Sequence, residues 1–453
     1  MTVYFADYAW LPHGWSGDAH LSVEGGVLGD VDDGASTADA RRLGRFVLPG
    51  MPNLHSHAFQ RAMAGLAERQ SNPQDNFWSW RETMYAFAGR IGPDDLRAIA
   101  AQSYVEMLKA GYTQVCEFHY LHHQPDGRPY ADTDAMSLAL IEAAREAGIG
   151  LTLLPVLYMT GGFDGRALSE RQRRFGFDVD GYLRLVEKLR KMEDSTLRIG
   201  IALHSLRAVP PQALNAVLDS KLGDRPVHIH IAEQIGEVQD CLNVRGARPV
   251  EWLLDNATVD ARWCLVHATH MTADETRGLA ECGAVAGLCP TTEANLGDGL
   301  FPLQDFRAAD GVLGIGSDSN ISISPVEELR WLEYGQRLSA HRRNVAVSDS
   351  STSVGENLWG DALYGGAQAA GAGTGAFEFG ARADLIVLDD HSPQLAGRDA
   401  GNVLDTFVFA GNVNPVREVM VNGEWVVRDF RHRNEERIAA RYREVVERLD
   451  SAI

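Results

Sequence analysis

The sequence predicts an α/β protein, a (β/α)₈ TIM-like barrel with a small β-sandwich built from both chain termini. Eight short apolar runs rich in β-branched residues alternate with longer amphipathic stretches from about residue 46 to residue 320. This region spans roughly 275 residues, close to the typical size of about 250 residues for such a barrel. Shorter strand-like runs flank it on both sides, which predicts a second, smaller β unit.

The expected barrel strands are separated by stretches with helical periodicity. Apolar positions recur at helical spacing in 93–111, 131–148, 179–192 and 209–220. A doubly wound open sheet would also alternate strands and helices, but the count of eight and the chemistry at the strand ends favour the barrel. The expected strands are 45–55, 112–120, 149–158, 198–207, 226–233, 263–270, 283–290 and 311–319.

The two ends of the chain have a different pattern from the middle. Residues 1–45 contain short apolar runs around a Gly-Gly turn, and residues 376–432 contain three more, with a strong β-hairpin signal at Asn422-Gly423. We expect these two pieces to form one small β-sandwich beside a hydrolase barrel of residues 46–375. Residues 433–453 have helical periodicity and are expected to form a C-terminal helix.

Composition restricts the class of partner. The chain of 453 residues has a formal net charge of −20, which argues against nucleic acid or an anionic membrane, because phosphate recognition needs a basic surface. A small anionic substrate would need local cations, and one or two arginines suffice because charge is screened beyond about 8 Å. Five cysteines without a Cys-x-x-Cys pair indicate free thiols. No signal peptide or membrane-spanning run is recognisable, so a cytoplasmic location is expected.

Metal-ligating residue types occur at the ends of the expected strands, where a parallel barrel collects its functional groups. His55 and His57 end the first strand, and side chains two residues apart on a strand point the same way. His230 ends the fifth strand and Asp318 the eighth. Each signal alone is weak, since a lone histidine or aspartate usually has a structural role. Together, three imidazoles and a carboxylate suit one Zn²⁺, or Fe²⁺ or Mn²⁺.

Further polar residues at the same strand ends predict hydrolytic chemistry. A bound Zn²⁺ lowers the pKa of its water to about 7, and hydrolysis then needs groups that take and give protons. Glu233 lies three residues past His230, and His267 ends the sixth strand as a second base or an electrostatic partner. Asp318 could both ligate the ion and hold a proton. The third and fourth strands end without the carboxylated lysine of two-metal barrels, so one ion is expected.

The motifs at these strand ends resemble the amidohydrolase superfamily, in its single-metal, deaminase-like branch. They are "PGMPNLHSH", "HIHIAEQ", "VHATH", "CPTTEANLGDG" and "GSDS". The order His-x-His, His, Glu, His, Asp is specific to that superfamily, and the match spans the whole barrel. Purine and cytosine deaminases of this branch tend to have "PGLINTHTH" and "CPxSN", from which this chain departs.

The departures are similar to the formimidoylglutamate deiminases, nearly end to end, including "NFWSWRETMY" (76–85) and "HSLRAVPP" (204–211). The resemblance implies hydrolysis of N-formimino-L-glutamate to N-formyl-L-glutamate and ammonia in histidine degradation. It also implies zinc and, by analogy, a homodimer. It assigns the metal ligands His55, His57, His230 and Asp318, the catalytic residues Glu233 and His267 with Asp318 shared, and the substrate contacts Gln60, Arg81, Tyr120, His204 and Arg207.

The charge chemistry agrees with this implication. Formiminoglutamate carries two carboxylates, and planar guanidinium groups suit carboxylates. Arg81 and Arg207 are therefore candidates for the local cations, although each could instead form an ordinary surface salt bridge. Trp78 and Trp80, in the same insertion as Arg81, are expected to serve packing.

Three alternatives remain at this point. An aromatic-ring aminohydrolase of the guanine, cytosine or adenosine type would need stacking aromatics and amide groups more than two arginines. A related acyclic reaction would release formamide and glutamate. A non-catalytic barrel would serve as a binding module, but every expected ligand position is filled.

Overall fold

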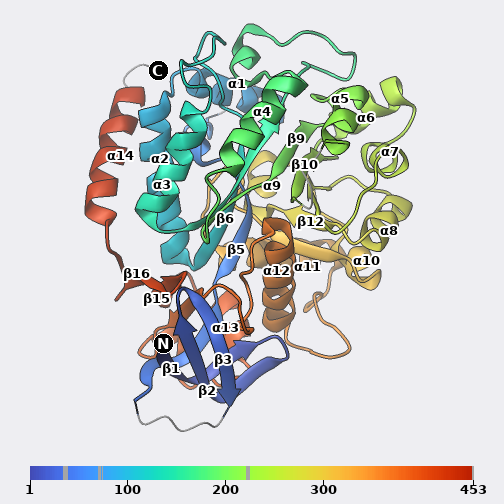
Figure 1. The fold of residues 1–453 in the computed structure, drawn as a ribbon. Helices are drawn as coiled ribbons and strands as arrows, with labels where there is room; N and C mark the ends of the chain where they lie inside the picture. Colours follow the sequence, from blue (N-terminus) through green and yellow to red (C-terminus); the bar gives the residue numbers. More distant parts are fainter. Residues whose placement is uncertain (34–38, 70–72, 74, 221–224, 451–453) are drawn as a thin grey trace.

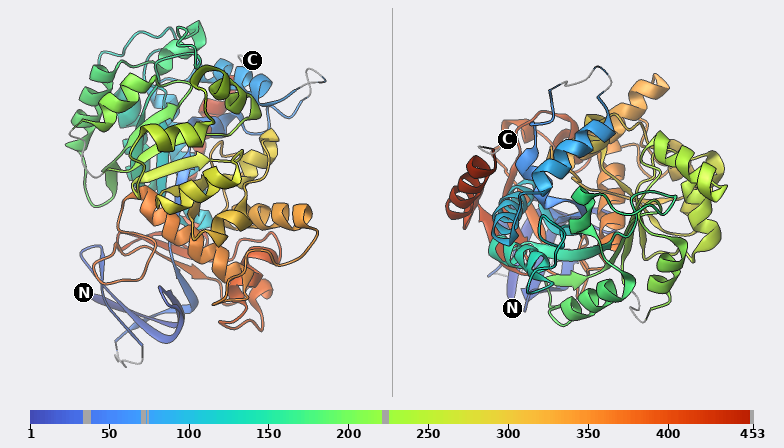
Figure 2. Two further views of the ribbon diagram at one scale, coloured as in Figure 1. Left: turned by 90° about the vertical axis from the view of Figure 1, so that its right-hand side faces the viewer. Right: turned by 90° about the horizontal axis from the view of Figure 1, so that it is seen from above.

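The computed structural model describes residues 1–33, 39–69, 73, 75–220 and 225–450. Parallel strands form a nearly closed barrel surrounded by helices, and strands from both termini form a separate mixed sheet at one end of it (Figures 1 and 2). The predicted barrel and the β unit built from both termini are confirmed, and over the described residues the strands of that unit, expected as a small sandwich, form one eight-stranded mixed sheet. The barrel strands, in spatial and chain order, are β5 (Met51–Ser56), β6 (Tyr112–His119), β7 (Gly150–Leu157), β8 (Leu197–Ile199) with β9 (Ile201–Ser205), β10 (Val227–Ile231), β11 (Trp263–His267), β12 (Val285–Leu288) and β13 (Val312–Ile315).

The barrel strands are apolar on both faces because one face lines the barrel and the other contacts helices. Every residue of β5, β6 and β7 is buried. Local sequence features mark where helices begin and end. Helix α2 (Pro93–Ala110) begins at a proline and is followed by Gly111, which has a left-handed backbone conformation. The helices of the barrel region are η1 (Ala58–Met63), α1 (Phe77–Ala88), α2 (Pro93–Ala110), α3 (Ala135–Ala147), η2 (Glu170–Phe175), α4 (Val179–Arg190), α5 (Pro211–Leu218), α6 (Ile235–Arg245), α7 (Pro249–Asn256), α8 (Ala273–Glu281), α9 (Pro290–Leu296), α10 (Leu303–Ala308), α11 (Pro325–Ala340) and α12 (Val354–Ala370).

The barrel closes where its first strand ends. The backbone N–H of Asp318 donates to the carbonyl of His55 at 2.9 Å, and the N–H of His57 donates to the carbonyl of Asp318 at 2.9 Å. Gly316 permits this approach, since a Cβ there would lie 2.8 Å from the backbone of His55. Elsewhere along β13 and β5, helix α12 packs against both strands. The backbone hydrogen bonds join the chain at the end of β5 to the chain just after β13, and both of these segments carry candidate metal ligands.

The predicted strand over 45–55 is two strands. Its first part lies in β4 (Arg41–Pro49) of the terminal sheet, and its second part is β5 of the barrel. The chain changes direction at Gly50, where a Cβ would lie 2.1 Å from the Oγ1 of Thr113. The terminal sheet has the order β17 (Arg431–His432), β16 (Glu424–Arg428), β15 (Val416–Val421), β14 (Leu385–Leu388), β4, β1 (Thr2–Leu11), β2 (Gly14–Glu24) and β3 (Val27–Asp33).

The C-terminal region contains the expected hairpin and helix. Asn422 and Gly423 have φ values of 50° and 78° between β15 and β16, which is the backbone of a tight hairpin turn. Helix α14 (Glu435–Asp450) lies beside α2 (Figure 1), and η3 (Pro393–Leu395) and α13 (Val403–Phe409) precede the hairpin. All five cysteines are free thiols. Within the described ranges, no helix combines the length and the apolar character needed to span a membrane.

Candidate metal centre and substrate cavity

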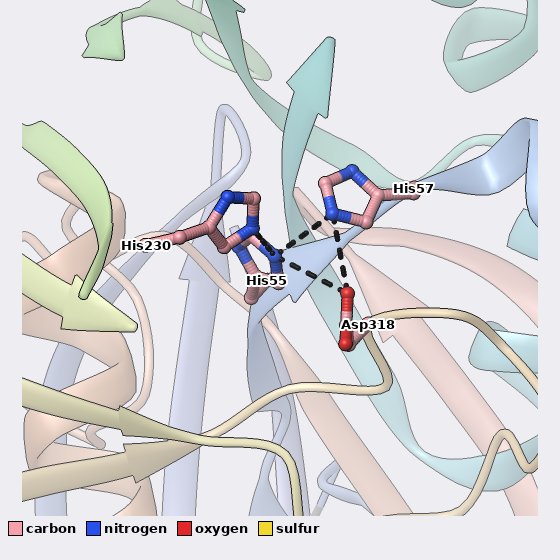
Figure 3. Close-up of side chains that lie close together, drawn as sticks. All are labelled: His55, His57, His230 and Asp318. Carbon is pink, nitrogen blue, oxygen red and sulfur yellow. Dashed lines mark hydrogen bonds and ion pairs between the residues drawn. The ribbon is translucent and has the colours of Figure 1, made fainter. Parts of the chain in front are cut away.

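Four side chains from three strand ends converge at the mouth of the barrel (Figure 3). The Nε2 atom of His55 lies 3.2 Å from that of His57 and 3.0 Å from that of His230. The Oδ1 atom of Asp318 lies 3.4 Å from the Nε2 of His55 and 3.2 Å from the Nε2 of His57. All four residues are buried. Their ligand atoms all lie within 4.8 Å of one another, so one divalent ion could contact all four.

Main-chain carbonyls orient two of these imidazoles. The Nδ1 of His57 lies 2.9 Å from the carbonyl of Phe118, and the Nδ1 of His230 lies 3.1 Å from the carbonyl of His204. A carbonyl can only accept, so each Nδ1 carries the proton and each Nε2 lone pair faces the centre. Metal-binding histidines commonly have this arrangement, and it fits a metal ion at this point.

Burial and hydrogen bonding keep the candidate ligands in the protonation states that metal binding requires. Burial lowers the pKa of His55 to about 3 and that of His230 well below its usual value, so both rings are neutral. Burial would raise the pKa of Asp318, but hydrogen bonds to His55 and His57 outweigh it and hold that pKa well below its usual value. A neutral imidazole and an ionised carboxylate are the forms that coordinate a metal.

A second charged group lies beside the metal set. The Nδ1 of His267 is 3.2 Å from the Oε1 of Glu293, and its Nε2 is 3.8 Å from the Oε1 of Glu233 and 3.9 Å from the Oδ2 of Asp318. Burial would lower the pKa of His267, but Glu233, Glu293 and Asp318 together raise it to about 10. Burial also raises the pKa of Glu233, to about 7. The two oxygens of Asp318 have different neighbours. Oδ1 lies next to the imidazoles of His55 and His57, and Oδ2 faces His267.

The strand ends that carry these residues have a strained backbone. Positive φ values occur at Ala232 (51°), His267 (70°) and Asp318 (41°), although none of them is glycine. Such conformations cost about 1–3 kcal/mol each and persist where the surroundings impose them. They turn the chain abruptly after β10, after β11 and beyond β13. Strain at three strand ends on the same side of a barrel is typical of a functional site.

The five predicted substrate contacts gather around the metal set. All of the predicted site residues except His55 line one cavity, and His55 lies fully buried next to it. The amide nitrogen of Gln60 donates to the hydroxyl of Tyr120 at 2.9 Å, while the amide oxygen of Gln60 is buried without a described partner. The Nδ1 of His204 lies 3.2 Å from the Oγ of Ser205, and burial holds its pKa well below its usual value.

The two arginines of the cavity are not paired with carboxylates. Across the described part of the chain, no acidic side chain forms an ion pair or hydrogen bond with Arg81 or Arg207, and the Nε of Arg81 is buried without a partner. The guanidinium of Arg81 stacks 4.4 Å above the ring of Trp78, and that of Arg207 lies 5.6 Å from the same ring. Trp78 thus supports both cations, a role beyond the packing expected for it.

Arg81 owes its place to helix α1, which lies at the opposite end of the barrel from the terminal sheet (Figure 1). The helix begins at a reciprocal cap: the side chain of Asn76 accepts from the N–H of Trp78 at 2.9 Å, and the Oγ of Ser79 accepts from the N–H of Asn76 at 2.9 Å. This cap fixes where α1 begins, and the starting point of a helix decides which of its residues face the cavity.

Comparison with known proteins places these features in a family. The model of the amidohydrolase family matches residues 46–426. The chain belongs to the amidohydrolase family. It is 53% identical over 451 residues to a formimidoylglutamate deiminase from Pseudomonas aeruginosa, covering 99% of this chain and 100% of that protein. It is 28% identical to a 5-methylthioadenosine/S-adenosylhomocysteine deaminase from Natronomonas pharaonis, covering 89% of this chain and 86% of that protein.

Solved amidohydrolase structures have the same architecture. The crystal structure of an amidohydrolase from Brucella melitensis matches with a TM-score of 0.94 at 46% identity, covering 99% of this chain and 100% of that one. An adenosine deaminase from Xanthomonas campestris with bound zinc matches with a TM-score of 0.82 at 22% identity, covering 99% of this chain and 98% of that one. The second likeness concerns the fold.

The cavity of this amidohydrolase includes residues that sequence reasoning missed. Tyr85 on α1, Tyr158 just after β7, and Glu237 on α6 line it together with the predicted residues. The carboxylate of Glu237 accepts from the N–H groups of Ala232 and Glu233 at 3.2 and 3.0 Å, which fixes the backbone that carries Glu233. Tyr158 ends an expected strand, so the strand-end rule could have found it. Nothing local marks Tyr85 or Glu237.

Proposed function

We propose that this chain hydrolyses N-formimino-L-glutamate to N-formyl-L-glutamate and ammonia, as its 53% identical relative from Pseudomonas aeruginosa is named to do. The reaction is a step of histidine degradation. One observation carries the proposal. Arg81 and Arg207, two guanidinium groups without a described carboxylate partner, line the same cavity as the His-His-His-Asp set. A substrate with two carboxylates and one amidine carbon suits both halves of such a cavity.

We further propose that the ion is Zn²⁺, held by His55, His57, His230 and Asp318. The ligand set of three imidazole nitrogens and one carboxylate oxygen supports this choice, although Fe²⁺ and Mn²⁺ accept the same ligands. When bound, such an ion acidifies a water molecule and so supplies the hydrolytic nucleophile at neutral pH. Metal analysis of the purified protein identifies the ion, and a preparation active with iron or manganese alone would contradict the choice of zinc.

The binding half of the cavity orients the substrate. Arg81 and Arg207 attract its two carboxylates, and their charges compensate for a chain whose net charge is −20. Gln60 has an amide oxygen without a described partner, and Tyr120 beside it supplies a hydroxyl. His204 is neutral, because burial holds its pKa well below the usual value, and it lies next to Arg207 in the cavity wall. These contacts place the formimino carbon toward the metal set.

Glu233 transfers the protons of the reaction, and His267 stabilises the charge that develops. Glu233 titrates near neutral pH, so it can take a proton from the attacking water and give it to the imino nitrogen. A second transfer to the same nitrogen releases ammonia. His267 has its pKa raised to about 10 and is therefore a cation, which suits stabilising the negative charge that develops on the attacking oxygen. Glu293, whose Oε1 lies 3.2 Å from the Nδ1 of His267, holds this ring in place, and the Oδ2 of Asp318 lies 3.9 Å from its Nε2.

The direct test measures ammonia release from N-formimino-L-glutamate, with guanine, cytosine and adenosine as competing candidates. The aromatic alternative remains a useful comparison because Phe77, Trp80 and Phe175 also line the cavity. Turnover of the linear substrate alone is expected, with N-formyl-L-glutamate as the product by mass analysis. Formamide as the main product would refute the proposed reaction, and a preference for a ring substrate would refute the substrate class.

A homodimer and a cytoplasmic location stay predictions. Light scattering of the purified protein measures the first, and a molecular mass equal to that of one chain would contradict it. The net charge of −20 still argues against a nucleic acid partner.

A further inference from the structure

One side-chain amide connects two of the tyrosines that line the cavity, Tyr85 and Tyr158. The amide nitrogen of Gln172, on η2, donates to the hydroxyl of Tyr158 at 3.0 Å and to the hydroxyl of Tyr85 at 3.3 Å. The amide oxygen of Gln172 accepts from the backbone N–H of Ser169 at 2.9 Å. A backbone N–H can only donate, so the orientation of this amide is determined, and both of its N–H groups point to the tyrosines.

This orientation decides what each tyrosine can still do. Both phenol oxygens accept from Gln172, and no described residue accepts the proton of either hydroxyl. A phenol O–H that already accepts one hydrogen bond is free to donate its own proton. Tyr85, Tyr158 and Gln172 are all buried, with exposed fractions of 6%, 2% and 6%, so these unmet donors lie away from bulk water.

The unmet donors lie in the same cavity wall as the arginines. Tyr85 and Tyr158 line the cavity together with Arg81 and Arg207, and the guanidinium of Arg81 lies 5.4 Å from the ring of Tyr85. Two cations and two O–H donors without acceptors form a site for a carboxylate rather than for a neutral ring.

The segment that carries Gln172 is held firmly to the rest of the wall. The guanidinium of Arg174, two residues further on, is 1% exposed and donates to the carbonyls of Ala88, Ile91 and His123. The backbone carbonyl of Arg174 accepts from the N–H of His123 at 3.0 Å. These bonds fix η2 against the end of α1, the helix that carries Tyr85.

We propose that Gln172 is a positioning residue that turns the hydroxyl protons of Tyr85 and Tyr158 toward a carboxylate of the substrate. The inference rests on the proposed function, because it needs a carboxylate-bearing substrate in this cavity. It adds two hydrogen-bond donors to the contacts assigned by resemblance. It also gives the segment before α4 a part in selecting dicarboxylates.

The experiment compares KM and kcat for N-formimino-L-glutamate in Tyr85→Phe, Tyr158→Phe and the double variant. Each removed hydroxyl is expected to raise KM by about tenfold, since a hydrogen bond to a charged group is lost, with kcat within about twofold. The double variant should also lose its preference for this substrate over N-formimino-norvaline or N-formimino-4-aminobutyrate, each of which lacks one carboxylate. Tyr364→Phe, a 66% exposed tyrosine on α12, is the matched control.

Gln172→Glu tests the positioning role. A carboxylate at this place would accept both phenol protons and reverse the hydrogen bonds, and its charge would also repel the substrate. The repulsion is present with or without the tyrosine hydroxyls, so the comparison is made in the wild-type and Tyr85→Phe/Tyr158→Phe backgrounds. We expect Gln172→Glu to raise KM by a factor at least about tenfold larger in the wild-type background than in the Tyr85→Phe/Tyr158→Phe background.

The outcomes separate the two proposals. Equal KM effects of Gln172→Glu in both backgrounds, or an unchanged KM in the double variant, would overturn the positioning role. A lower melting temperature with unchanged KM and kcat would make the bridge merely structural and would also overturn it. If the wild-type protein releases no ammonia from N-formimino-L-glutamate, the proposed function fails, and the inference fails with it.

Discussion

Two arginine sites, Arg382 buried at the terminal sheet and Arg207 half-buried in the cavity wall, differ in what binds the guanidinium. Arg382 precedes β14, and its guanidinium binds the carboxylate of Asp384 through Nε at 3.0 Å and through a terminal nitrogen at 2.5 Å. Asp384 also accepts from Thr374 at 2.8 Å and from the N–H of Asn422 at 2.9 Å. Arg207 in the cavity has no carboxylate bound among the described residues.

The difference indicates which charge the fold satisfies internally and which it leaves for a ligand. A buried charge is costly unless it is paired, so an unpaired guanidinium is retained for a purpose other than stability. Burial would lower the pKa of Arg207, but charge interactions with neighbouring groups, Glu237 and Glu233 among them, raise it above its usual value. Neither carboxylate forms an ion pair with this guanidinium. Substitutions in the cavity should therefore reduce activity, and substitutions at the Arg382 pair should reduce stability.

The largest effect is expected at the metal set. His230→Asn should lower turnover by about 10⁴-fold or more, because the acidified water is lost, while the free energy of unfolding of the metal-free protein changes little. Metal content, turnover and denaturant unfolding measure the three quantities. His228→Asn is the neighbouring control: the Nε2 of His228 lies 2.9 Å from the carbonyl of Ala369, away from the metal set, so this variant should keep its metal. Normal turnover by a metal-free His230→Asn protein would contradict the assignment.

Glu233→Gln should lower kcat by about a thousandfold with the metal still bound, because the proton carrier is removed. The carboxyl of Glu233 must be ionised to accept a proton, and burial raises its pKa to about 7, so kcat of the wild type should rise with pH up to about 7 and level off above it. The residual activity of the variant should lack this rise. Glu142→Gln, an exposed residue of α3, is the control, and near-normal turnover of Glu233→Gln would disprove the role.

The terminal sheet should respond in the opposite way. Arg382→Met leaves Asp384 buried without its cation, which should lower the free energy of unfolding by about 3 kcal/mol, with kcat and KM unchanged at temperatures where the variant is folded. Urea unfolding and steady-state kinetics measure both. Arg145→Met, which breaks an exposed pair with Asp194, should cost less than about 0.5 kcal/mol. A loss of substrate affinity in Arg382→Met would contradict a purely structural role for Arg382.

Arg207→Met should weaken substrate binding and change the stability of the protein very little. KM for N-formimino-L-glutamate is expected to rise by about 10–100-fold, as for the loss of a charged hydrogen bond, and the rise should shrink for substrates that lack a carboxylate. The free energy of unfolding should stay within about 0.5 kcal/mol of the wild type, because no carboxylate loses a partner. A destabilisation as large as that of Arg382→Met would show that Arg207 is a structural residue.

The sequence predicted much of the site because one rule connects it to the fold. Parallel barrel strands end on the same side, so His55, His230 and Asp318 could be brought together without knowing any distance between them. The alternation of side chains along a strand added His57 to the same face. The break of the strand at Gly50 was missed, because an apolar run gives no sign of which sheet each part joins.

Residue types at the strand ends, and the need for local cations in an acidic chain, could be read from the sequence alone. Which charges stay unpaired depends on the folded chain, because residue type alone does not show that Arg382 has a carboxylate partner and Arg207 has none among the described residues. The tertiary structure also decided the left-handed backbone at His267 and Asp318, and the bridge from Gln172 to Tyr85. Local patterns arise from short-range sterics and burial, whereas pairing and strain depend on segments far apart in the chain that meet only when it folds.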